Sequence, residues 1–323
     1  MKHSRAIAVS GLFLAALFFA SLLPMFSGQA PIPTGKSKFF GSQVQKYDPP
    51  TDPALYVGAE TCKTCHEDKY KSYEETRHFA TMLDTRKGLE WRGCEACHGP
   101  GKAHVDGGGD KSKIFRFREA PGRKASLRCL ACHASGEDQA NFLRSTHGKS
   151  DVGCLECNSV HKPVVEKALL RAPQATLCFR CHLEVKPEFS KPFHHRVNEG
   201  LISCGDCHNP HGGFDAQQIR SSAGQDTVCY KCHASKTGPF AFEHAVVKAE
   251  GCTACHSSHG SANPRLLKRS QINLLCLECH TTTAWSAVPE APSFHNRAQK
   301  YQACTLCHPA IHGSNSDHFL MKP

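Results

Sequence analysis

The cysteines of this chain are the residues whose type and spacing most clearly indicate a chemical role. All 20 cysteines form ten Cys-x-x-Cys pairs, and nine of these pairs are followed directly by histidine. Two thiols at this spacing can add across the two vinyl groups of one haem, and the adjacent histidine then lies beneath the iron as an axial ligand. The pattern therefore predicts c-type haem attachment through Cys62, Cys65, Cys94, Cys97, Cys129, Cys132, Cys154, Cys157, Cys178, Cys181, Cys204, Cys207, Cys229, Cys232, Cys252, Cys255, Cys276, Cys279, Cys304 and Cys307.

The histidines that follow the cysteine pairs argue against other uses of paired cysteines. A zinc site needs two pairs that converge on one metal and has no use for a histidine directly after nearly every pair. A disulfide framework would scatter its cysteines instead of placing them in ten identical pairs. Haem attachment is the remaining reading, and its predicted proximal iron ligands are His66, His98, His133, His182, His208, His233, His256, His280 and His308.

Histidines outside the motifs fall into register with the haem sites. The chain has 22 histidines, of which 13 lie outside the motifs. Ten of these flank every second motif, one on each side, so they supply one further ligand for each of ten haems. This register predicts six-coordinate iron held by one motif histidine and one distal histidine. The predicted distal ligands are His78, His104, His147, His161, His195, His211, His244, His259, His295 and His312.

Two features of the distal set bear on which haem each histidine ligates. His195 is preferred to His194 because its separation from the next cysteine equals that of His295. A histidine three residues after a motif histidine, such as His211 or His259, is too close in sequence to reach the far face of its own haem. We expect such a histidine to ligate a neighbouring haem and so to lock adjacent haems together. The histidines left over are His3, His194 and His318.

The motifs repeat in pairs, with a period of about 50 residues in the middle of the chain. Such a repeat predicts about five di-haem modules in a quasi-linear array. Strand patterns are nearly absent, so we expect a multihaem cytochrome c of irregular loops and short α-helices, including helices over residues 175–182 and 270–280, with little or no β-structure. The multihaem domain is predicted at residues 58–313, with modules at 58–106, 125–163, 174–213, 225–261 and 272–313.

The two ends of the chain differ from this domain. Residues 1–30 carry Lys2 and Arg5, then an apolar run, then small residues, which is the layout of an export signal. Export agrees with haem attachment, which in bacteria happens outside the cytoplasmic membrane. The apolar run of about 20 residues is also long enough to span a bilayer, so an uncleaved anchor is the alternative. Residues 31–57 are predicted to be a tether and residues 314–323 a C-terminal tail.

The composition indicates that the cofactors form much of the core. Apolar residues make up 40% of the chain, but that share includes the 20 cysteines and the leader. We therefore expect the haem-free chain to be largely unfolded. The formal charge of +10 does not require nucleic acid as a partner. Each haem adds roughly −1 when oxidised and −2 when reduced through its propionates, so basic residues are expected to pair with propionates.

Several segments resemble one family. They are CEACHGP at Cys94, CGDCHNPHGG at Cys204, GPFAFEHA around His244, CTACHSSHG at Cys252 and CHPAIHGSN at Cys307. Together they resemble the MtrA/DmsE family of periplasmic decahaem c-type cytochromes over nearly the whole chain after the tether. The resemblance implies an electron conduit across the periplasm and outer membrane, for extracellular electron transfer or respiration to an outer acceptor. It implies redox protein partners, with no nucleic acid and no small-molecule substrate.

The implied partners are an inner-membrane or periplasmic electron donor, an outer-membrane porin in which the chain is embedded, and an outer-surface cytochrome or reductase as acceptor. An extracellular cytochrome filament is an alternative assembly. The expected role is electron transfer without catalysis.

The chain departs from the family at Asn158, where the motif Cys154-x-x-Cys157 lacks its histidine. Nine haems are predicted by motif, and the tenth site has three possible outcomes. The haem is absent, or it is attached with a substitute ligand such as His194 or His318, or it is attached with five-coordinate iron. The candidate distal ligand His161 is still present. Five-coordinate iron would make a multihaem reductase with an open haem the alternative function.

Overall fold

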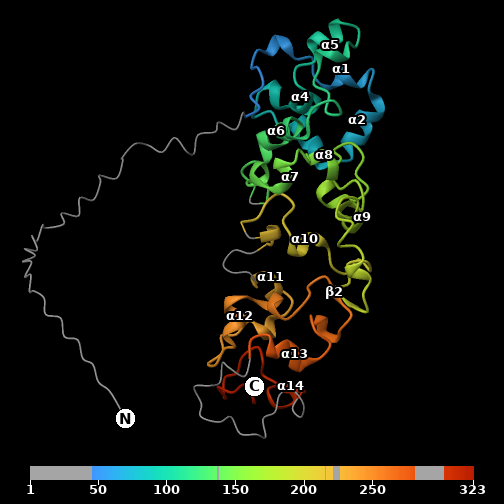
Figure 1. The fold of residues 1–323 in the computed structure, drawn as a ribbon. Coiled ribbons are helices and arrows are strands. Elements are labelled where there is room, and N and C mark those ends of the chain that lie inside the picture. The colour runs from blue at the N-terminus through green and yellow to red at the C-terminus, as the bar shows by residue number, and fades with distance from the viewer. Residues whose placement is uncertain (1–45, 137, 215, 221–225, 281–301) are drawn as a thin grey trace, which may run out of the picture. The chain divides into compact units, whose positions relative to one another are not determined.

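The computed structural model describes residues 46–136, 138–214, 216–220, 226–280 and 302–323 (Figure 1). The predicted leader, most of the tether, His3 and His295 lie outside the described residues. Within the described part, no helix is long and apolar enough to cross a membrane.

Short helices and loops make up the described chain, as the sequence predicted. The longest helix, α6, has twelve residues, and the other α-helices have four to eight. The α-helices are α1 (Ala59–Lys63), α2 (Glu67–Glu74), α3 (Ala80–Leu83), α4 (Gly93–His98), α5 (Lys102–Asp106), α6 (Gly122–His133), α7 (Thr146–Lys149), α8 (Cys154–Cys157), α9 (Gln174–Phe179), α10 (Cys204–Cys207), α11 (Thr227–Tyr230), α12 (Ala245–Ala249), α13 (Ile272–Leu277) and α14 (Cys304–Cys307).

Single turns of 3₁₀ helix connect many of these α-helices. They are η2 (Pro53–Leu55), η3 (Arg77–Phe79), η4 (Leu89–Trp91), η5 (Lys111–Lys113), η6 (Phe142–Arg144), η7 (Lys167–Leu169), η8 (Glu188–Ser190), η9 (Ala216–Gln218), η10 (Ala234–Lys236), η11 (Cys252–Ala254) and η12 (Pro264–Leu266). The sheet of the described residues has two strands, β1 (Phe193–His194) and β2 (Gly260–Ser261). The strands are antiparallel, with Phe193 opposite Ser261 and His194 opposite Gly260.

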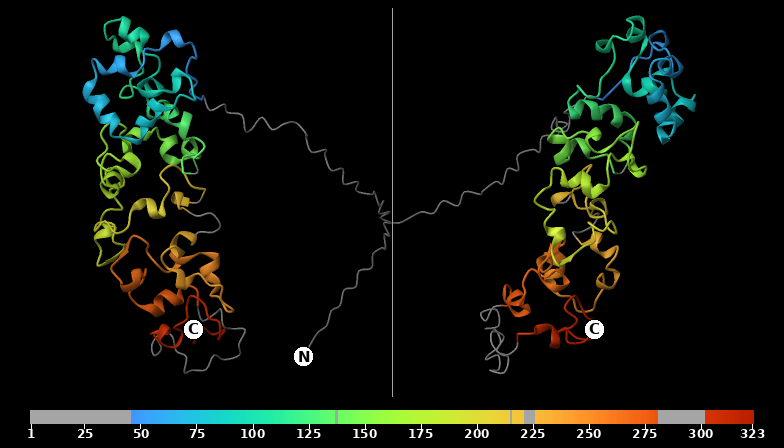
Figure 2. Two further views of the ribbon diagram at one scale, coloured as in Figure 1. Left: turned by 180° about the vertical axis from the view of Figure 1, so that it is seen from behind. Right: turned by 90° about the vertical axis from the view of Figure 1, so that its right-hand side faces the viewer.

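The helices that carry consecutive motifs pack against each other. Contacts join α1 to α4, α6 to α8, α9 to α10, α10 to α11, and α13 to α14. In the three ribbon views the colour runs broadly from α1–α5 at one end of the described chain to α13 and α14 at the other (Figures 1 and 2). This order confirms the predicted array of repeated modules, whereas the exact module boundaries stay a prediction.

Most motifs lie on one turn of helix. In α8, for example, the amide of Asn158 donates to the carbonyl of Cys154 at 2.9 Å. At α10, the amide of His208 donates to the carbonyl of Cys204 at the same distance. The helices predicted over residues 175–182 and 270–280 end three residues earlier than expected, as α9 and α13. The amide of His182 still donates to Cys178, so the last turn of the motif keeps its shape.

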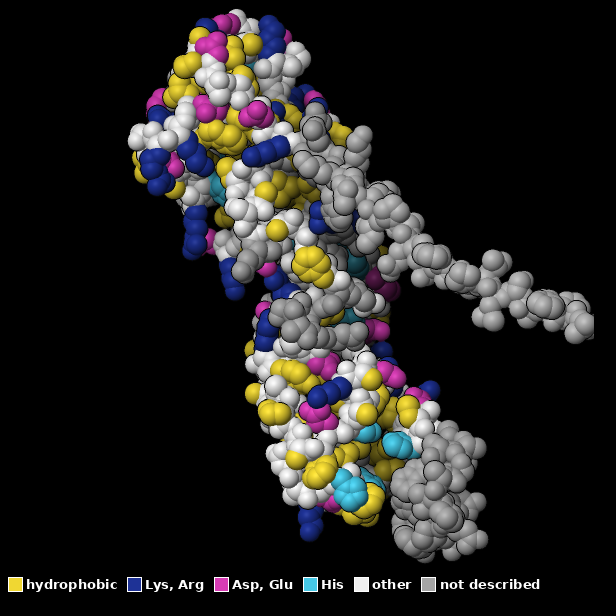
Figure 3. Space-filling view, turned by 90° about the vertical axis from the view of Figure 1, so that its left-hand side faces the viewer, with side chains coloured by type: hydrophobic (Ala, Val, Ile, Leu, Met, Phe, Trp, Pro, Cys, Tyr) yellow, Lys and Arg dark blue, Asp and Glu magenta, His cyan; other side chains and the backbone are white. Residues whose placement is uncertain are grey.

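The protein core of the described chain is small. Among the residues that the structure describes, thirteen hydrophobic residues are buried, and the largest fully buried side chains are those of Ser126 and Ser314. Large apolar side chains are exposed, including Phe214 at 88% and Leu306 at 83%. Figure 3 shows many hydrophobic side chains on the face that it draws. A chain that leaves this much apolar surface in water lacks the burial needed to offset its conformational entropy.

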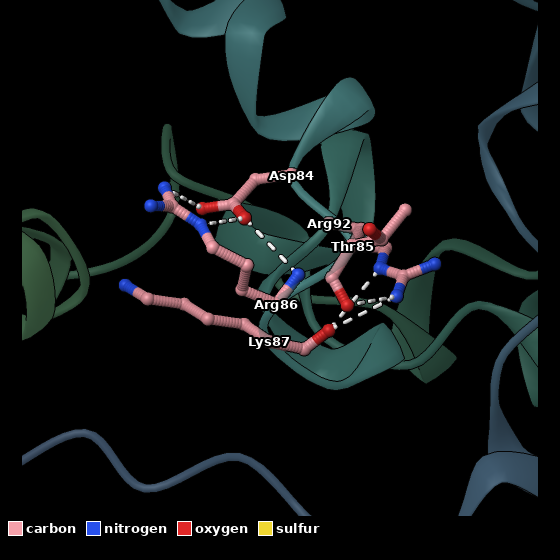
Figure 4. Close-up of polar contacts among 5 residues, drawn as sticks. All are labelled: Asp84, Thr85, Arg86, Lys87 and Arg92. Atoms are coloured by element: carbon pink, nitrogen blue, oxygen red, sulfur yellow. Dashed lines mark hydrogen bonds and ion pairs between the residues drawn. The ribbon is translucent and has the colours of Figure 1, made fainter.

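The loop between α3 and α4 is held by its own polar contacts (Figure 4). The guanidinium of Arg86 bonds to Asp84 at 2.8 Å and holds the pKa of that carboxyl at about 2. Arg92, the residue before α4, donates to the carbonyls of Thr85 and Lys87 at 3.1 Å. The loop therefore fixes the point at which the second motif begins.

A buried carboxylate organises the first module. Glu95, inside the second motif, is 3% exposed. Its Oε1 accepts from the amides of Val57 at 3.1 Å and Gly101 at 2.7 Å, and its Oε2 accepts from Gly58 at 2.9 Å. Three amides that would otherwise be unpaired are thus satisfied by one side chain.

Replacing Glu95 with glutamine should weaken this module, because the new amide nitrogen cannot accept from Gly58. The loss should be about 1–3 kcal/mol, measured as faster hydrogen exchange at the amides of Val57, Gly58 and Gly101 in the holo-protein. The exposed Glu75→Gln is the matched control. Unchanged exchange in the Glu95 variant would contradict this account of the module.

The haem-free chain should be largely unfolded, because its apolar surface needs the cofactor to cover it. Protein without residues 1–30, made in a cytoplasm that does not attach haem, should show a disordered far-UV circular dichroism spectrum and no cooperative melting. The exported holo-protein serves as the control. A compact haem-free chain with a sharp thermal transition would contradict this expectation.

Candidate haem sites

Pairs of imidazole rings face one another at a nearly constant distance. Eight pairs have ring centroids 6.0–6.4 Å apart, and each pair joins a motif histidine to a histidine outside the motifs. The pairs are His66 with His104, His98 with His161, His133 with His78, His182 with His147, His208 with His259, His233 with His195, His256 with His312, and His280 with His244.

This distance fits one metal ion held between two imidazoles. A metal–imidazole bond is about 2.0–2.1 Å, and a five-membered ring with bonds of about 1.33 Å has a radius of about 1.1 Å. One bond length and one ring radius on each side of the metal give about 6.2–6.4 Å between the two ring centroids. The ring planes range from nearly parallel, as for His256 and His312 at 15°, to 61° apart for His195 and His233. The residues therefore fit iron between paired histidines.

Backbone carbonyls fix the orientation of many of these rings. The Nδ1 atoms of His98, His208 and His256 lie 2.8–3.0 Å from the carbonyls of Phe115, Gln217 and Arg265. A carbonyl can only accept, so each Nδ1 carries the proton and each Nε2 keeps a free lone pair for a metal. The same contact to a carbonyl is made by Nδ1 of His104, His147, His195 and His308.

Burial keeps several of the rings neutral. Desolvation is the largest cause of a lowered pKa at six of the predicted ligands. A neutral imidazole is the form that binds a metal, so the lowered pKa values prepare these side chains for ligation. The six are His78, His98, His161, His211, His244 and His312.

Distal histidines that come just after one motif face the histidine of an earlier motif. His259 faces His208, and His312 faces His256. This placement agrees with the expectation that such histidines ligate a neighbouring site. His161 faces His98, so it belongs to the second motif and not to the Asn158 site, to which the sequence analysis assigned it.

The leftover histidines are held by other contacts. His194 has Nδ1 against the carbonyl of Lys191 and Nε2 at 2.9 Å from the carboxylate of Glu199, which raises the pKa of the imidazole. His195 is instead the ring that faces His233, in agreement with the choice made from spacing. The ring of His318 packs on the ring of Phe319, with 3.8 Å between the ring centroids.

The cysteines show which motifs are neighbours. Their Sγ atoms are thiols in this structure and stand for the thioether sulfurs of the haem-bound protein. The first cysteines of paired motifs touch: Cys62 with Cys94, Cys129 with Cys154, Cys178 with Cys204, Cys229 with Cys252, and Cys276 with Cys304.

The second cysteines join one pair of motifs to the next. Cys97 lies near Cys132, Cys157 near Cys181, Cys207 near Cys232, and Cys255 near Cys279. With the contacts between first cysteines, these close approaches connect all ten motifs in the order of the chain.

Some residues at these sites carried no sequence signal. The carbonyls that fix His208 and His256 belong to Gln217 and Arg265, which have left-handed backbone conformations with φ of 52° and 58°. Residues other than glycine rarely adopt this conformation, so the sequence does not predict it. Asp226 lies beside the cysteines Cys229 and Cys252, but its carboxylate accepts from the amide of Cys252 and thus supports the motif itself.

Comparisons with known proteins agree with these sites. The doubled CXXCH motif family matches residues 146–187, 194–238 and 244–284. The family of cytochrome c554 and c-prime matches residues 61–91 and 110–161. The chain is 31% identical over 270 residues to the multiheme cytochrome MtrA of Shewanella baltica (strain OS185), covering 80% of this chain and 79% of that protein.

Removing one distal imidazole should open one site. In His104→Ala, His66 loses the ring that faces it, so the high-spin ferric signal in electron paramagnetic resonance should grow by one haem relative to the unaltered protein. His194→Ala is the matched control and should leave the spectrum unchanged. Identical spectra for His104→Ala and the unaltered protein would contradict the assignment of His104 as a ligand.

Proposed function

Because the chain belongs to the MtrA family of multihaem c-type cytochromes, we propose that it serves as an electron conduit. Haem supplies a reversible one-electron couple when it is bound. The observation that carries the proposal is the succession of motifs in chain order: motif helices such as α1 and α4, or α9 and α10, pack together, and cysteines such as Cys97 and Cys132 lie near each other between one pair of motifs and the next. Sites held in such close succession favour electron movement from one end of the array to the other.

The paired imidazoles support electron transfer rather than substrate chemistry. Each of the eight pairs places a ring on both sides of the position that fits iron, so these sites leave no room for a substrate to bind the metal. Hydrogen bonds such as that from His256 to Arg265 hold the rings in place. A ligand set that is fixed on both sides changes little when the iron changes oxidation state. The proposed activity at these sites is therefore electron transfer without catalysis.

We place the conduit in the periplasm, exported by the leader in residues 1–30. Its proposed partners are redox proteins: a donor in the inner membrane or periplasm, and an acceptor at the outer surface that is reached through an outer-membrane porin. If each haem step adds about 10 Å, ten steps in file exceed the ~40–45 Å thickness of a membrane.

A break in the middle of the array should interrupt the proposed conduit. The holo-protein is attached to an electrode through its C-terminal end, and the charge exchanged in fast-scan voltammetry is measured. In Cys178→Ala/Cys181→Ala, which lacks the fifth haem, only the haems on the electrode side of the break should respond at scan rates where the unaltered protein responds fully.

The matched control is Cys62→Ala/Cys65→Ala, which removes the haem at the far end and should cost the charge of that haem alone. If both variants lose the charge of one haem and no more, the sites do not conduct in series and the proposed conduit is wrong.

A further inference from the structure

The Asn158 site keeps the backbone of an intact haem site. After three of the motifs, the chain returns through a turn with two left-handed residues: Ala168 and Leu169, Gln217 and Gln218, and Arg265 and Leu266. Each turn forms the same antiparallel bridge, from Asn158 to Leu170, from His208 to Ile219, and from His256 to Leu267. Replacing the motif histidine has therefore not changed the fold around it.

Asn158 also keeps the hydrogen bond of the missing imidazole. Its Nδ2 donates to the carbonyl of Ala168 at 2.8 Å, where Nδ1 of His208 bonds to Gln217 at 2.9 Å and Nδ1 of His256 bonds to Arg265 at 2.8 Å. Asparagine, however, ends at the level of Nδ1 and has no atom in the place of Nε2, the nitrogen that binds iron. The side chain thus preserves the support of the ligand without supplying the ligand.

The histidine that serves this site can be found from the register of the other sites. His195 bonds through Nδ1 to the carbonyl of Ser258, which precedes His259, and His259 faces the motif histidine His208. One repeat later, His244 bonds to the backbone of Ile311, which precedes His312, and His312 faces His256. In both cases the residue that follows the bonded carbonyl is the distal histidine of an even-numbered motif, counting the motifs from Cys62: the sixth, with His208, and the eighth, with His256.

One repeat earlier, the same contact points to His211. Nδ1 of His147 lies 2.9 Å from the carbonyl of Pro210, which precedes His211. Gly212, with φ of 112°, packs closely against Asn141, which lies in the stretch that leads to the fourth motif. A Cβ atom added at Gly212 would lie 3.0 Å from the carbonyl oxygen of Asn141. By register, the residue that His211 should face is Asn158.

The burial of His211 agrees with this position. Its Nδ1 is buried without a hydrogen-bond partner among the described residues, as are the Nδ1 atoms of His78 and His161. His78 and His161 both face a motif histidine, at 6.0 and 6.4 Å. His211 is the one distal histidine of the described chain that faces no imidazole at this distance. The substitutes have other contacts: Nε2 of His194 lies 2.9 Å from Glu199, and the ring of His318 packs against the rings of Phe242 and Phe319.

The geometry points to an open coordination position in this chain. His211 would be the single protein ligand to the iron of a haem held by Cys154 and Cys157, and the side of that iron toward Asn158 would be open to a small exogenous ligand. The class of ligand follows from the metal: neutral diatomic molecules on ferrous iron, and water or small anions such as cyanide on ferric iron. This inference rests on the proposed function only in treating the chain as a multihaem cytochrome.

The first test uses the exported holo-protein. Intact mass should show ten haems, and carbon monoxide added to the reduced protein should bind one haem per chain, seen in the difference spectrum. Asn158→His should keep ten haems, abolish carbon monoxide binding and remove the high-spin ferric signal. Nine haems in the unaltered protein, or ten haems with no carbon monoxide binding, would overturn the inference.

The second test identifies the axial ligand. In the ferrous nitrosyl complex, a nitrogen ligand opposite nitric oxide adds splitting to the paramagnetic resonance signal. This splitting should be lost in His211→Ala and retained in the matched controls His194→Ala and His318→Ala. Retained splitting in His211→Ala would show that another residue is the ligand. The voltammetry above tests the conduit separately, so series conduction in a nine-haem protein would sink this inference and leave the proposed function standing.

Discussion

The pairing of imidazoles across motifs is the constraint on which the described structure depends. A motif histidine is positioned by its own helical turn, but the ring opposite it comes from a different part of the chain. His259 reaches His208, and His312 reaches His256, so each of these sites ties together two even-numbered motifs. The cysteine contacts tie each motif to its immediate neighbours. Ligation and attachment thus act as two interlocking sets of crosslinks.

This arrangement explains how a chain with so small a core can have a defined fold. In the described part of the chain, the largest fully buried side chains are two serines, and both connect segments by hydrogen bonds: Ser126 Oγ accepts from the amide of Cys154 in α8, and Ser314 Oγ accepts from the amides of Ser316 and Asp317. Apolar burial, which dominates the stability of ordinary globular domains, is here left to the cofactor. The short helices need only to present each motif, and the loops need only to return a histidine.

The sequence was sufficient to predict the chemical groups, because covalent haem attachment demands cysteines and histidine at fixed spacing. Eight of the ten predicted distal histidines face a motif histidine, among them His195, which spacing favoured over His194. The pairings could not be predicted, because a ring such as His78 finds its partner His133 beyond an intervening motif. The supporting carbonyl of Ala168 and the buried carboxylate of Glu95 likewise depend on tertiary contacts that leave no local pattern in the sequence.

The pairing of motifs with later histidines also sets an order for maturation. If the chain is exported from its N-terminus, as proposed, the second motif emerges before His161 and the sixth motif before His259. Thioether formation at these motifs can therefore precede the arrival of the residue that completes the iron's ligand shell. Until translocation delivered that residue, each such iron would have one vacant face, and the nascent cytochrome would pass through a sequence of ligand-binding states that the finished array conceals.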